Sequence, residues 1–214
     1  MDWDAVLKKM AARVDLYSVP SVTKIAESRD PFRVLISTMI SLRTKDDVTI
    51  KAADRLLSEA HTPAAVAGLS VGKIESLIYP AGFYRVKAGN IKKTASIIQT
   101  RFDGKVPAEM GDLLSLPGVG RKTANLVLGL GFGIDAICVD THVHRIPNRL
   151  AWITTDDPEE TEGELERILP KKYWVWINSL LVTYGKKVCL PVSPLCSTCP
   201  LEGDCPKRGV AKHR

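Results

Sequence analysis

Apolar residues recur along most of this chain at the three- and four-residue spacing of an α-helix. The clearest run follows Asp30 and Pro31, a pair that favours a helix start because Asp caps the first turn and Pro tolerates its geometry. The pattern predicts an amphipathic helix from residue 31. Its apolar face comprises Phe32, Leu35, Ile36, Met39 and Ile40. Cap residues mark three further helix starts, at Thr62-Pro63, Ser70 and Asp157-Pro158.

Glycines mark two expected helix ends. Gly82 and Gly185 each follow an apolar run, and both are predicted to be C′ residues because a left-handed conformation costs glycine little. Runs of alternating β-branched residues between turns are nearly absent. With 45% hydrophobic and 25% charged residues in a chain of 214, there is ample material for a buried core. These patterns predict an all-α fold.

Basic residues are concentrated near the C-terminal end. The net charge is +6, and residues 171–214 hold eight Lys and Arg against two Asp and Glu, so the rest of the chain is neutral overall. This excess indicates either a polyanionic partner such as nucleic acid or a solvated basic tail. The chain begins Met1-Asp2 without a basic and apolar leader, and its longest uncharged apolar stretch covers only residues 126–134. We therefore expect an intracellular protein without a membrane span.

Four of the five cysteines lie close together, whereas Cys138 stands alone in an apolar context that suggests a core position. The four are Cys189, Cys196, Cys199 and Cys205. Disulfides are disfavoured because the expected compartment keeps thiols reduced. Four thiolates suit either a structural Zn²⁺ or a [4Fe–4S] cluster, and the short spacing between Cys196 and Cys199 fits both. The spacing predicts a metal centre of one of these two kinds.

Residues 116–124 read Leu-Pro-Gly-Val-Gly-Arg-Lys-Thr-Ala and lie between two helical stretches. Gly118 and Gly120 allow a tight turn and a close approach of the backbone to a partner. The next helix start presents unpaired N–H groups, and Arg121 and Lys122 add two cations. A helix-hairpin-helix that binds phosphate is therefore favoured over an ordinary turn between helices. The glycine spacing is not that of a Walker loop.

Lys122 and Asp140 each have two interpretations. The Lys122 amine is either a phosphate contact or a nucleophile that forms a Schiff base. Asp140 follows an apolar run and precedes a polar stretch, so it is either a helix N-cap or a functional carboxylate. His142 and His144 are not expected to form a metal pair, because residues two apart on a helix point to different faces.

Together, residues 116–124, residues 139–145 and the spacing of the four cysteines resemble the endonuclease III family of base-excision DNA glycosylases, within the helix-hairpin-helix superfamily. The agreement runs from about Pro31 to Cys205. The resemblance implies a [4Fe–4S] cluster rather than zinc. It also implies two lobes with a DNA-binding cleft between them, namely a six-helix barrel over residues 24–134 and an iron–sulfur cluster domain formed by residues 1–23 and 135–214.

The family's mechanism can be assigned to the matched positions. The resemblance implies that a damaged pyrimidine, such as thymine glycol, is flipped out of double-stranded DNA. Lys122 matches the family's nucleophile, which attacks C1′, releases the base and cleaves the abasic site by β-elimination through a Schiff base. Asp140 matches the partner carboxylate, whose charge stabilises the cationic sugar. The implied protein is a monomeric, DNA-associated glycosylase and AP lyase that acts on damaged bases and abasic sites.

The resemblance also indicates DNA contacts. Relatives commonly fill the gap left by the flipped nucleotide with a Gln, but this chain has Arg43 there, which is expected either to enter the DNA or to touch a phosphate. The other candidates are Gly118, Val119, Gly120 and Arg121 of the hairpin, with Lys186 and Lys187 beyond it. Two alternatives remain, a mismatch-specific glycosylase on the same scaffold and a non-catalytic DNA-binding protein that uses the hairpin alone.

Overall fold

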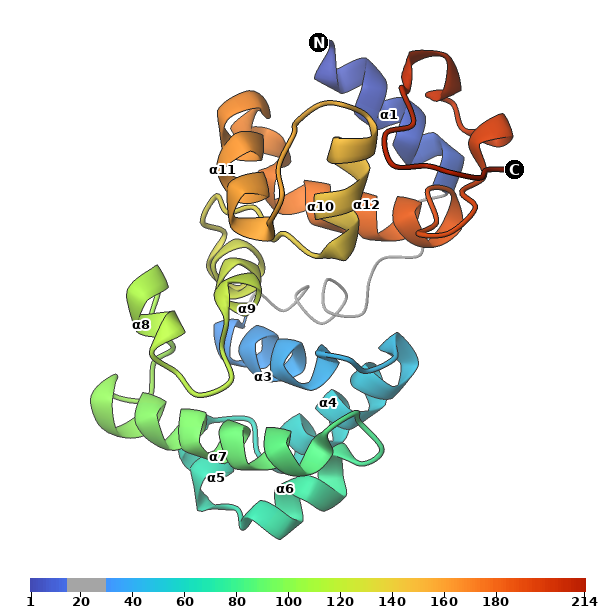
Figure 1. Cartoon of the computed structure of the whole chain (residues 1–214). Coiled ribbons are helices and arrows are strands. Elements are labelled where there is room, and N and C mark those ends of the chain that lie inside the picture. Colours follow the sequence, from blue (N-terminus) through green and yellow to red (C-terminus); the bar gives the residue numbers. More distant parts are fainter. Residues whose placement is uncertain (15–29) are drawn as a thin grey trace. The chain divides into compact units, whose positions relative to one another are not determined.

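The computed structural model describes residues 1–14 and 30–214, which are mostly helical and contain no strand (Figure 1). These described residues form two compact units, one of residues 1–14 with 137–214 and one of residues 30–136. The expected boundary between residues 23 and 24 lies outside the described residues. The prediction of an all-α fold is confirmed. Within the described part of the chain, no helix has the length and apolar content needed to cross a membrane.

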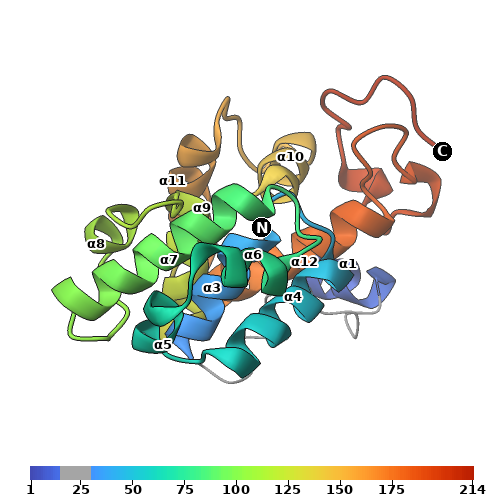
Figure 2. The same ribbon diagram turned by 90° about the horizontal axis from the view of Figure 1, so that it is seen from below.

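The unit of residues 30–136 is built around α3 (Pro31–Ser41) (Figure 2). This helix contacts α4, α7 and α9 and the π-helical turn η2. The elements around it are α4 (Asp46–Glu59), α5 (Pro63–Gly68), α6 (Val71–Ile78), α7 (Tyr84–Arg101), α8 (Met110–Leu114), α9 (Arg121–Leu126) and η2 (Val127–Phe132). One apolar core fills the unit, and α3 lies at its centre.

The predicted helix starts are confirmed because their cap side chains are in place. Oδ1 of Asp30 accepts hydrogen bonds from the N–H groups of Phe32 (2.9 Å) and Arg33 (3.2 Å) at the start of α3. The caps of α5, α6 and α11 (Pro158–Ile168) also accept backbone N–H groups; they are Thr62, Ser70 and Asp157. Each interaction spans two or three residues, so the local sequence is sufficient to specify it.

The prediction that α3 is amphipathic is wrong. Its expected apolar face is buried, but Val34, Ser37 and Thr38 are also completely buried although they lie outside that face. Thr38 satisfies its hydroxyl by donating to the carbonyl oxygen of Val34 at 2.8 Å. Because α4, α7, α9 and η2 all contact α3, polar positions are covered along with apolar ones.

The prediction that Gly82 and Gly185 are left-handed C′ residues is also wrong. Gly185 lies inside α12 (Trp174–Lys187), Gly82 lies between α6 and α7, and neither has a positive φ. A Cβ atom on Gly82 would lie 2.3 Å from the carbonyl oxygen of Arg43, and one on Gly185 would lie 2.1 Å from Nδ1 of His142. Close approach of distant residues therefore explains both glycines.

The unit of residues 1–14 and 137–214 is arranged around α12, whose residues 177–185 are all buried. This helix contacts α1 (Trp3–Val14) and α10 (Thr141–Arg149), and α10 also contacts α11. After α12 the chain forms only two short 3₁₀ turns, η4 (Cys196–Thr198) and η5 (Glu202–Asp204). A second apolar core, separate from the first, joins the helices of this unit.

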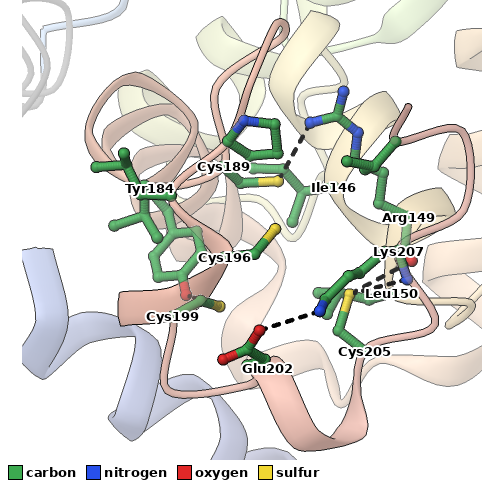
Figure 3. Close-up of a pocket in the computed structure, with 14 residues that line it drawn as sticks. Ile146, Arg149, Leu150, Tyr184, Cys189, Cys196, Cys199, Glu202, Cys205 and Lys207 are labelled. Atoms are coloured by element: carbon green, nitrogen blue, oxygen red, sulfur yellow. Dashed lines mark hydrogen bonds and ion pairs between the residues drawn. The ribbon is translucent and has the colours of Figure 1, made fainter. Parts of the chain in front are cut away.

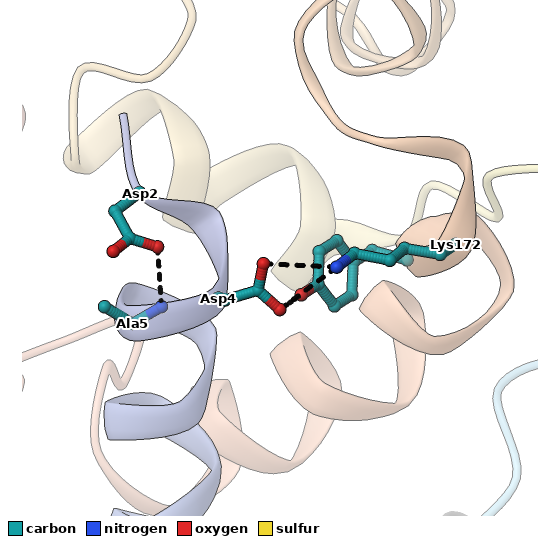
Figure 4. Close-up of polar contacts among 5 residues, drawn as sticks. Asp2, Asp4, Ala5 and Lys172 are labelled. Carbon is teal, nitrogen blue, oxygen red and sulfur yellow. Dashed lines mark hydrogen bonds and ion pairs between the residues drawn. The ribbon is translucent and has the colours of Figure 1, made fainter.

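Polar contacts attach both ends of α1 to this unit, and Figure 4 shows those at its N-terminal end. The Asp4 carboxylate accepts hydrogen bonds from the hydroxyl of Tyr173 and from Nζ of Lys172, the latter at 3.1 Å to each oxygen. These donors, Tyr173 foremost, lower the pKa of Asp4. At the other end, Nζ of Lys187 donates to the carbonyl oxygen of Val14 at 2.8 Å. The first helix is thus fixed to residues more than 150 positions away in the sequence.

Candidate functional site

The predicted helix-hairpin-helix is present, with α8 before the hairpin and α9 after it. Gly118 has a φ of 78°, and a Cβ there would lie 2.9 Å from Nδ2 of Asn90 on α7. Thr94, also on α7, donates its hydroxyl to the carbonyl oxygen of Pro117 at 2.9 Å. A Cβ on Gly120, in contrast, would meet no atom within 4 Å. Packing on α7 therefore explains Gly118, whereas Gly120 leaves the hairpin backbone open to a partner.

An open pocket with about 1000 Å³ of empty space adjoins the hairpin. Three cationic side chains line it: Lys122 from the first turn of α9, Lys87 from α7 and Arg43 from the loop after α3. The other lining residues are Met39, Ser41, Leu42, Phe83, Val86, Asn90 and Gly118. A concave site with several cations and an apolar wall suits an anionic, partly aromatic ligand.

Arg43 and Phe83 come together at this pocket although 40 positions separate them in the sequence. The Arg43 guanidinium carbon lies 5.6 Å from the centre of the Phe83 ring, within the range of a cation–π interaction. Both residues have positive φ values, 52° for Arg43 and 57° for Phe83. Phe83 is 62% exposed, which is unusual for a large aromatic side chain. The pair is a stacked cation and ring presented toward solvent.

Asp140 is the N-cap of α10. Its Oδ1 accepts hydrogen bonds from the N–H groups of His142 and Val143, both at 2.9 Å, and Oδ2 takes no part in these two bonds. The segment before it is held by Asn178 of α12, whose Nδ2 donates to the carbonyl oxygen of Cys138 at 2.9 Å. The N-cap interpretation is confirmed. Asp140 belongs to the unit of residues 137–214 and Lys122 to that of residues 30–136.

The four clustered cysteines line one small cavity (Figure 3). All four are free thiols. They are Cys189, Cys196, Cys199 and Cys205. In the described residues, no three His, Cys, Asp or Glu side chains are grouped so that they could hold a metal ion. Cys138, the fifth cysteine, is buried in its unit, as expected from its apolar context.

Polar groups of the surrounding chain lie within hydrogen-bond distance of three of these sulfur atoms. The hydroxyl of Tyr184 is 3.0 Å from Sγ of Cys199. Nη1 of Arg149 donates to Sγ of Cys189 at 3.6 Å, and the backbone N–H of Lys207 donates to Sγ of Cys205 at 3.4 Å. Burial raises the pKa of the Cys205 thiol. Arg149 is itself only 8% exposed and also holds the carbonyl oxygens of residues 190 and 191 at 2.7 Å. Such donors suit sulfur ligands of a cluster, whose charge they partly compensate.

The remaining basic candidates lie at the surface. Arg121 is exposed at the start of α9, and Lys186 and Lys187 are exposed at the end of α12. Lys187 also donates to the carbonyl oxygen of Val14, so part of its hydrogen-bonding capacity serves its own unit.

Comparison with known proteins places this chain in a family. A family model for the HhH-GPD superfamily of base excision DNA repair proteins matches residues 36–171. Endonuclease III of Thermotoga maritima is 47% identical over 176 residues, which cover 82% of this chain and 83% of that protein. The chain belongs to the endonuclease III family.

The endonuclease III relationship extends to plants and to solved structures. Endonuclease III homolog 2, chloroplastic, of Arabidopsis thaliana is 46% identical over 82% of this chain, which spans 48% of that longer protein. A solved structure of a trapped endonuclease III–DNA covalent intermediate has a TM-score of 0.81 and 33% identity, covering 95% of this chain and 94% of that one. The chain is therefore a base-excision repair enzyme of the DNA glycosylase and AP lyase class, which excludes the non-catalytic alternative.

The sequence did not reveal every residue at the endonuclease III pocket. Phe83 and Lys87 are not among the predicted site residues. Nothing in the neighbouring sequence distinguishes the buried amine of Lys87 from an exposed one. Only the packing of α7 against the end of α3 brings both residues to the pocket.

Proposed function

We propose that this endonuclease III family member removes oxidised or otherwise damaged pyrimidines, such as thymine glycol, from double-stranded DNA and cleaves the resulting abasic site. The place of Lys122 carries the proposal. It follows the hairpin directly, in the first turn of α9, and lines the open pocket. The similarity to an endonuclease III that was trapped in a covalent intermediate with DNA supports a nucleophile at this position rather than a simple phosphate contact.

In this proposal the Nζ atom of Lys122 attacks C1′ of the flipped nucleotide, and the bond from C1′ to the base breaks. The C1′–O4′ bond then opens as Nζ loses a proton and O4′ gains one, so that an imine forms between Nζ and C1′. This imine acidifies the proton on C2′. Loss of that proton expels the 3′ phosphate, so the strand is cut on the 3′ side of the lesion. Water then hydrolyses the imine and frees the lysine.

Asp140 supplies the second charged group of the proposed reaction. Two N–H groups at the start of α10 hold its Oδ1, which fixes the position of the carboxylate. A fixed negative charge stabilises the positive charge that develops on the sugar as the base leaves. Oδ2 remains for contact with the sugar or with a proton in transit.

The proposed grip on DNA combines backbone and side-chain contacts. The open backbone at Gly120, with Gly118, Val119 and Arg121, suits a phosphate group because N–H donors and a cation lie together. Lys186 and Lys187 add positive charge from the other unit. We propose that the enzyme works inside the cell as a monomer.

We propose that Arg43 and Phe83 enter the DNA together where the damaged nucleotide has left the stack. A planar guanidinium can stack on bases and donate to their edges, and an exposed phenyl ring can replace a lost stacking partner. Their contact at 5.6 Å, beside the pocket that Lys122 lines, supports this role. A guanidinium lacks an acceptor, so Arg43 favours partner bases that present acceptors.

The four cysteines are proposed to hold a [4Fe–4S] cluster. Four thiolates that line one cavity, with no His or carboxylate ligand assigned to it, suit a soft iron–sulfur centre, and the resemblance to endonuclease III favours the cluster over zinc. When bound, the cluster would cross-link residues 189–205 and brace the irregular end of the chain. Residues 1–23 and 135–214 would then form the cluster domain, and residues 24–134 the barrel.

Borohydride trapping tests the proposed function. The enzyme is incubated with duplexes that carry thymine glycol, an abasic site or a T·G mismatch, and covalent adducts are counted. We expect adducts on the first two duplexes. Lys122→Gln should form no covalent adduct and should cleave neither of these two duplexes. It should still bind both, because only the nucleophile is lost. Lys93→Gln, which changes an exposed lysine on α7, is the matched control and should behave like the parent.

Two outcomes would overturn the assignment. An adduct that Lys122→Gln forms at the parent rate would mean that another amine is the nucleophile. Base release from the T·G duplex alone would establish the mismatch-specific alternative instead.

A further inference from the structure

Lys87 is a buried lysine whose hydrogen-bond acceptors are all neutral. Lys87 lies on the first turn of α7 and is only 8% exposed. Nζ donates to the carbonyl oxygens of Ile40 (2.6 Å) and Leu42 (2.5 Å) and to the hydroxyl of Thr44 (2.8 Å). The three protons of the ammonium thus meet three acceptors, and burial lowers the pKa of Lys87 to about 8.

Lys87 closes the end of α3, because its ammonium group bonds carbonyl oxygens there. Burying an ammonium without a carboxylate costs free energy, so its position at the pocket is compared with that of a lysine that closes a helix elsewhere. Lys92, also on α7, offers a comparison, because its Nζ donates to the carbonyl oxygens of Ala67 and Leu69 at the end of α5. Lys92 is only partly buried and lies away from the pocket, as a purely structural helix cap would.

The acceptors of Lys87 surround Arg43 in the chain. Leu42 precedes Arg43 and Thr44 follows it, while Ile40 belongs to the last turn of α3. Arg43 has a φ of 52°, a conformation that a non-glycine residue keeps only when its surroundings hold it there. One ammonium group therefore holds the backbone before this left-handed residue and the side chain of the residue after it.

The same contacts reach the loop that carries Phe83. The Thr44 hydroxyl that accepts from Lys87 also accepts the backbone N–H of Gly82 at 3.1 Å. Gly82 lies so close that a Cβ would be 2.3 Å from the carbonyl oxygen of Arg43. The two loops are therefore joined through Lys87 and Thr44, which leaves the Arg43 guanidinium 5.6 Å from the Phe83 ring.

We propose that Lys87 is a positioning residue that holds Arg43 and Phe83 side by side, so that the pair enters DNA in one geometry and discriminates among the bases opposite the lesion. This inference rests on the proposed function, in which these two side chains fill the gap in the duplex. Lys87 touches no reacting atom and acts only through the loop that it fixes.

A double-mutant cycle tests the inference. Single-turnover excision of thymine glycol opposite each of the four bases is measured for the parent, Arg43→Ala, Lys87→Met and the double variant. Lys87→Met should slow excision by about 10- to 100-fold, as misplacement of a positioning group does, and should shift the ranking of opposite bases as Arg43→Ala does. The excision rate of the double variant should fall no further than that of the slower single variant, because both changes disrupt the same positioned Arg43 side chain.

Lys92→Met is the matched control. It removes an equivalent lysine contact from the same helix and should lower the melting temperature without changing the ranking of opposite bases. The inference would be overturned if the fold losses in excision rate multiplied in the double variant. It would also be overturned if Lys87→Met kept the parental ranking of opposite bases. A parental ranking in Arg43→Ala would overturn it as well, since Lys87 would then have nothing to position.

Two further measurements keep the test decisive. If Lys87→Met does not fold, Thr44→Val removes only the shared hydroxyl and should shift the same ranking by a smaller factor. Adduct formation by the parent on a preformed abasic site reports the proposed function separately. An active parent with unchanged ranking in all variants refutes the role of Lys87, whereas a parent that forms no adduct refutes the function itself.

Discussion

Residues 30–136 surround α3 with apolar side chains from every neighbouring helix, whereas residues 189–214 bury only three apolar side chains, Pro194, Cys196 and Leu201. The first segment closes its helix ends with cations from other helices, as Lys87 does for α3 and Lys92 for α5. The second relies on short turns and on the buried Arg149, which holds its carbonyl groups. A helical core stabilises itself, while an irregular segment needs a cross-link.

The largest expected effect comes from removing that cross-link. Cys199→Ser should eliminate one ligand of the proposed cluster and lower the free energy of unfolding by about 5 kcal/mol. The protein should also lose the brown colour that an iron–sulfur cluster gives it. Thermal unfolding followed by circular dichroism, together with iron analysis, measures both effects. Cys138→Ser changes a buried cysteine outside the cluster and should keep the iron. A colourless parent with one zinc per chain would contradict the cluster.

A cavity at the centre of the helical unit should have the next largest effect. Ile36 is completely buried in α3, so Ile36→Ala should cost about 3 to 4 kcal/mol through lost burial and an unfilled cavity. Ile134 in the same unit is 42% exposed, and Ile134→Ala should cost less than about 1 kcal/mol. Urea unfolding compares them. Equal losses in the free energy of unfolding would mean that α3 is not the centre of the core. The iron content should stay unchanged in both variants, because neither residue belongs to the unit that carries the proposed cluster.

A smaller effect should separate two helical glycines of the other unit. A methyl group at residue 185 would lie 2.1 Å from Nδ1 of His142, whereas one at residue 163 would meet nothing within 4 Å. Gly185→Ala should therefore cost about 1 to 3 kcal/mol by overpacking, and Gly163→Ala should gain about 0.5 to 1 kcal/mol because alanine favours the helix. Melting temperatures show whether each change stabilises or destabilises the protein. Stabilisation by both changes would show that His142 moves aside freely.

The smallest expected effect is a pH dependence from the helical unit. Burial lowers the pKa of Lys87 from 10.5 to about 8, so the unfolded chain binds more protons than the folded chain between these values. Stability therefore gains from this group as the pH rises, by about 1 kcal/mol from pH 8 to about pH 9. Lys87→Met should lack that gain when urea unfolding is repeated at both pH values. A parental pH slope in the variant would contradict the shift.

The helix starts were accessible to the sequence because each depends on a few adjacent residues. A cap such as Asp30 or Asp157 bonds to N–H groups two and three positions later, so the signal and the structure occupy the same stretch of chain. The hairpin at residues 116–124 and the clustered cysteines are similarly compact patterns. The family resemblance rested on these local motifs, and the comparisons confirm it.

Contacts between distant residues depended on the tertiary structure. The sequence contains glycine at residues 82 and 185, but it does not show why glycine is needed there. The reason is the close approach of Arg43 to residue 82 and of His142 to residue 185. The sequence showed Arg43 at a helix end but not Phe83 against it, and it could not show that Lys87 is buried. Local order is encoded by neighbours in the chain, whereas burial and long-range contact exist only once separate helices have packed, because packing alone determines which side chains lose water.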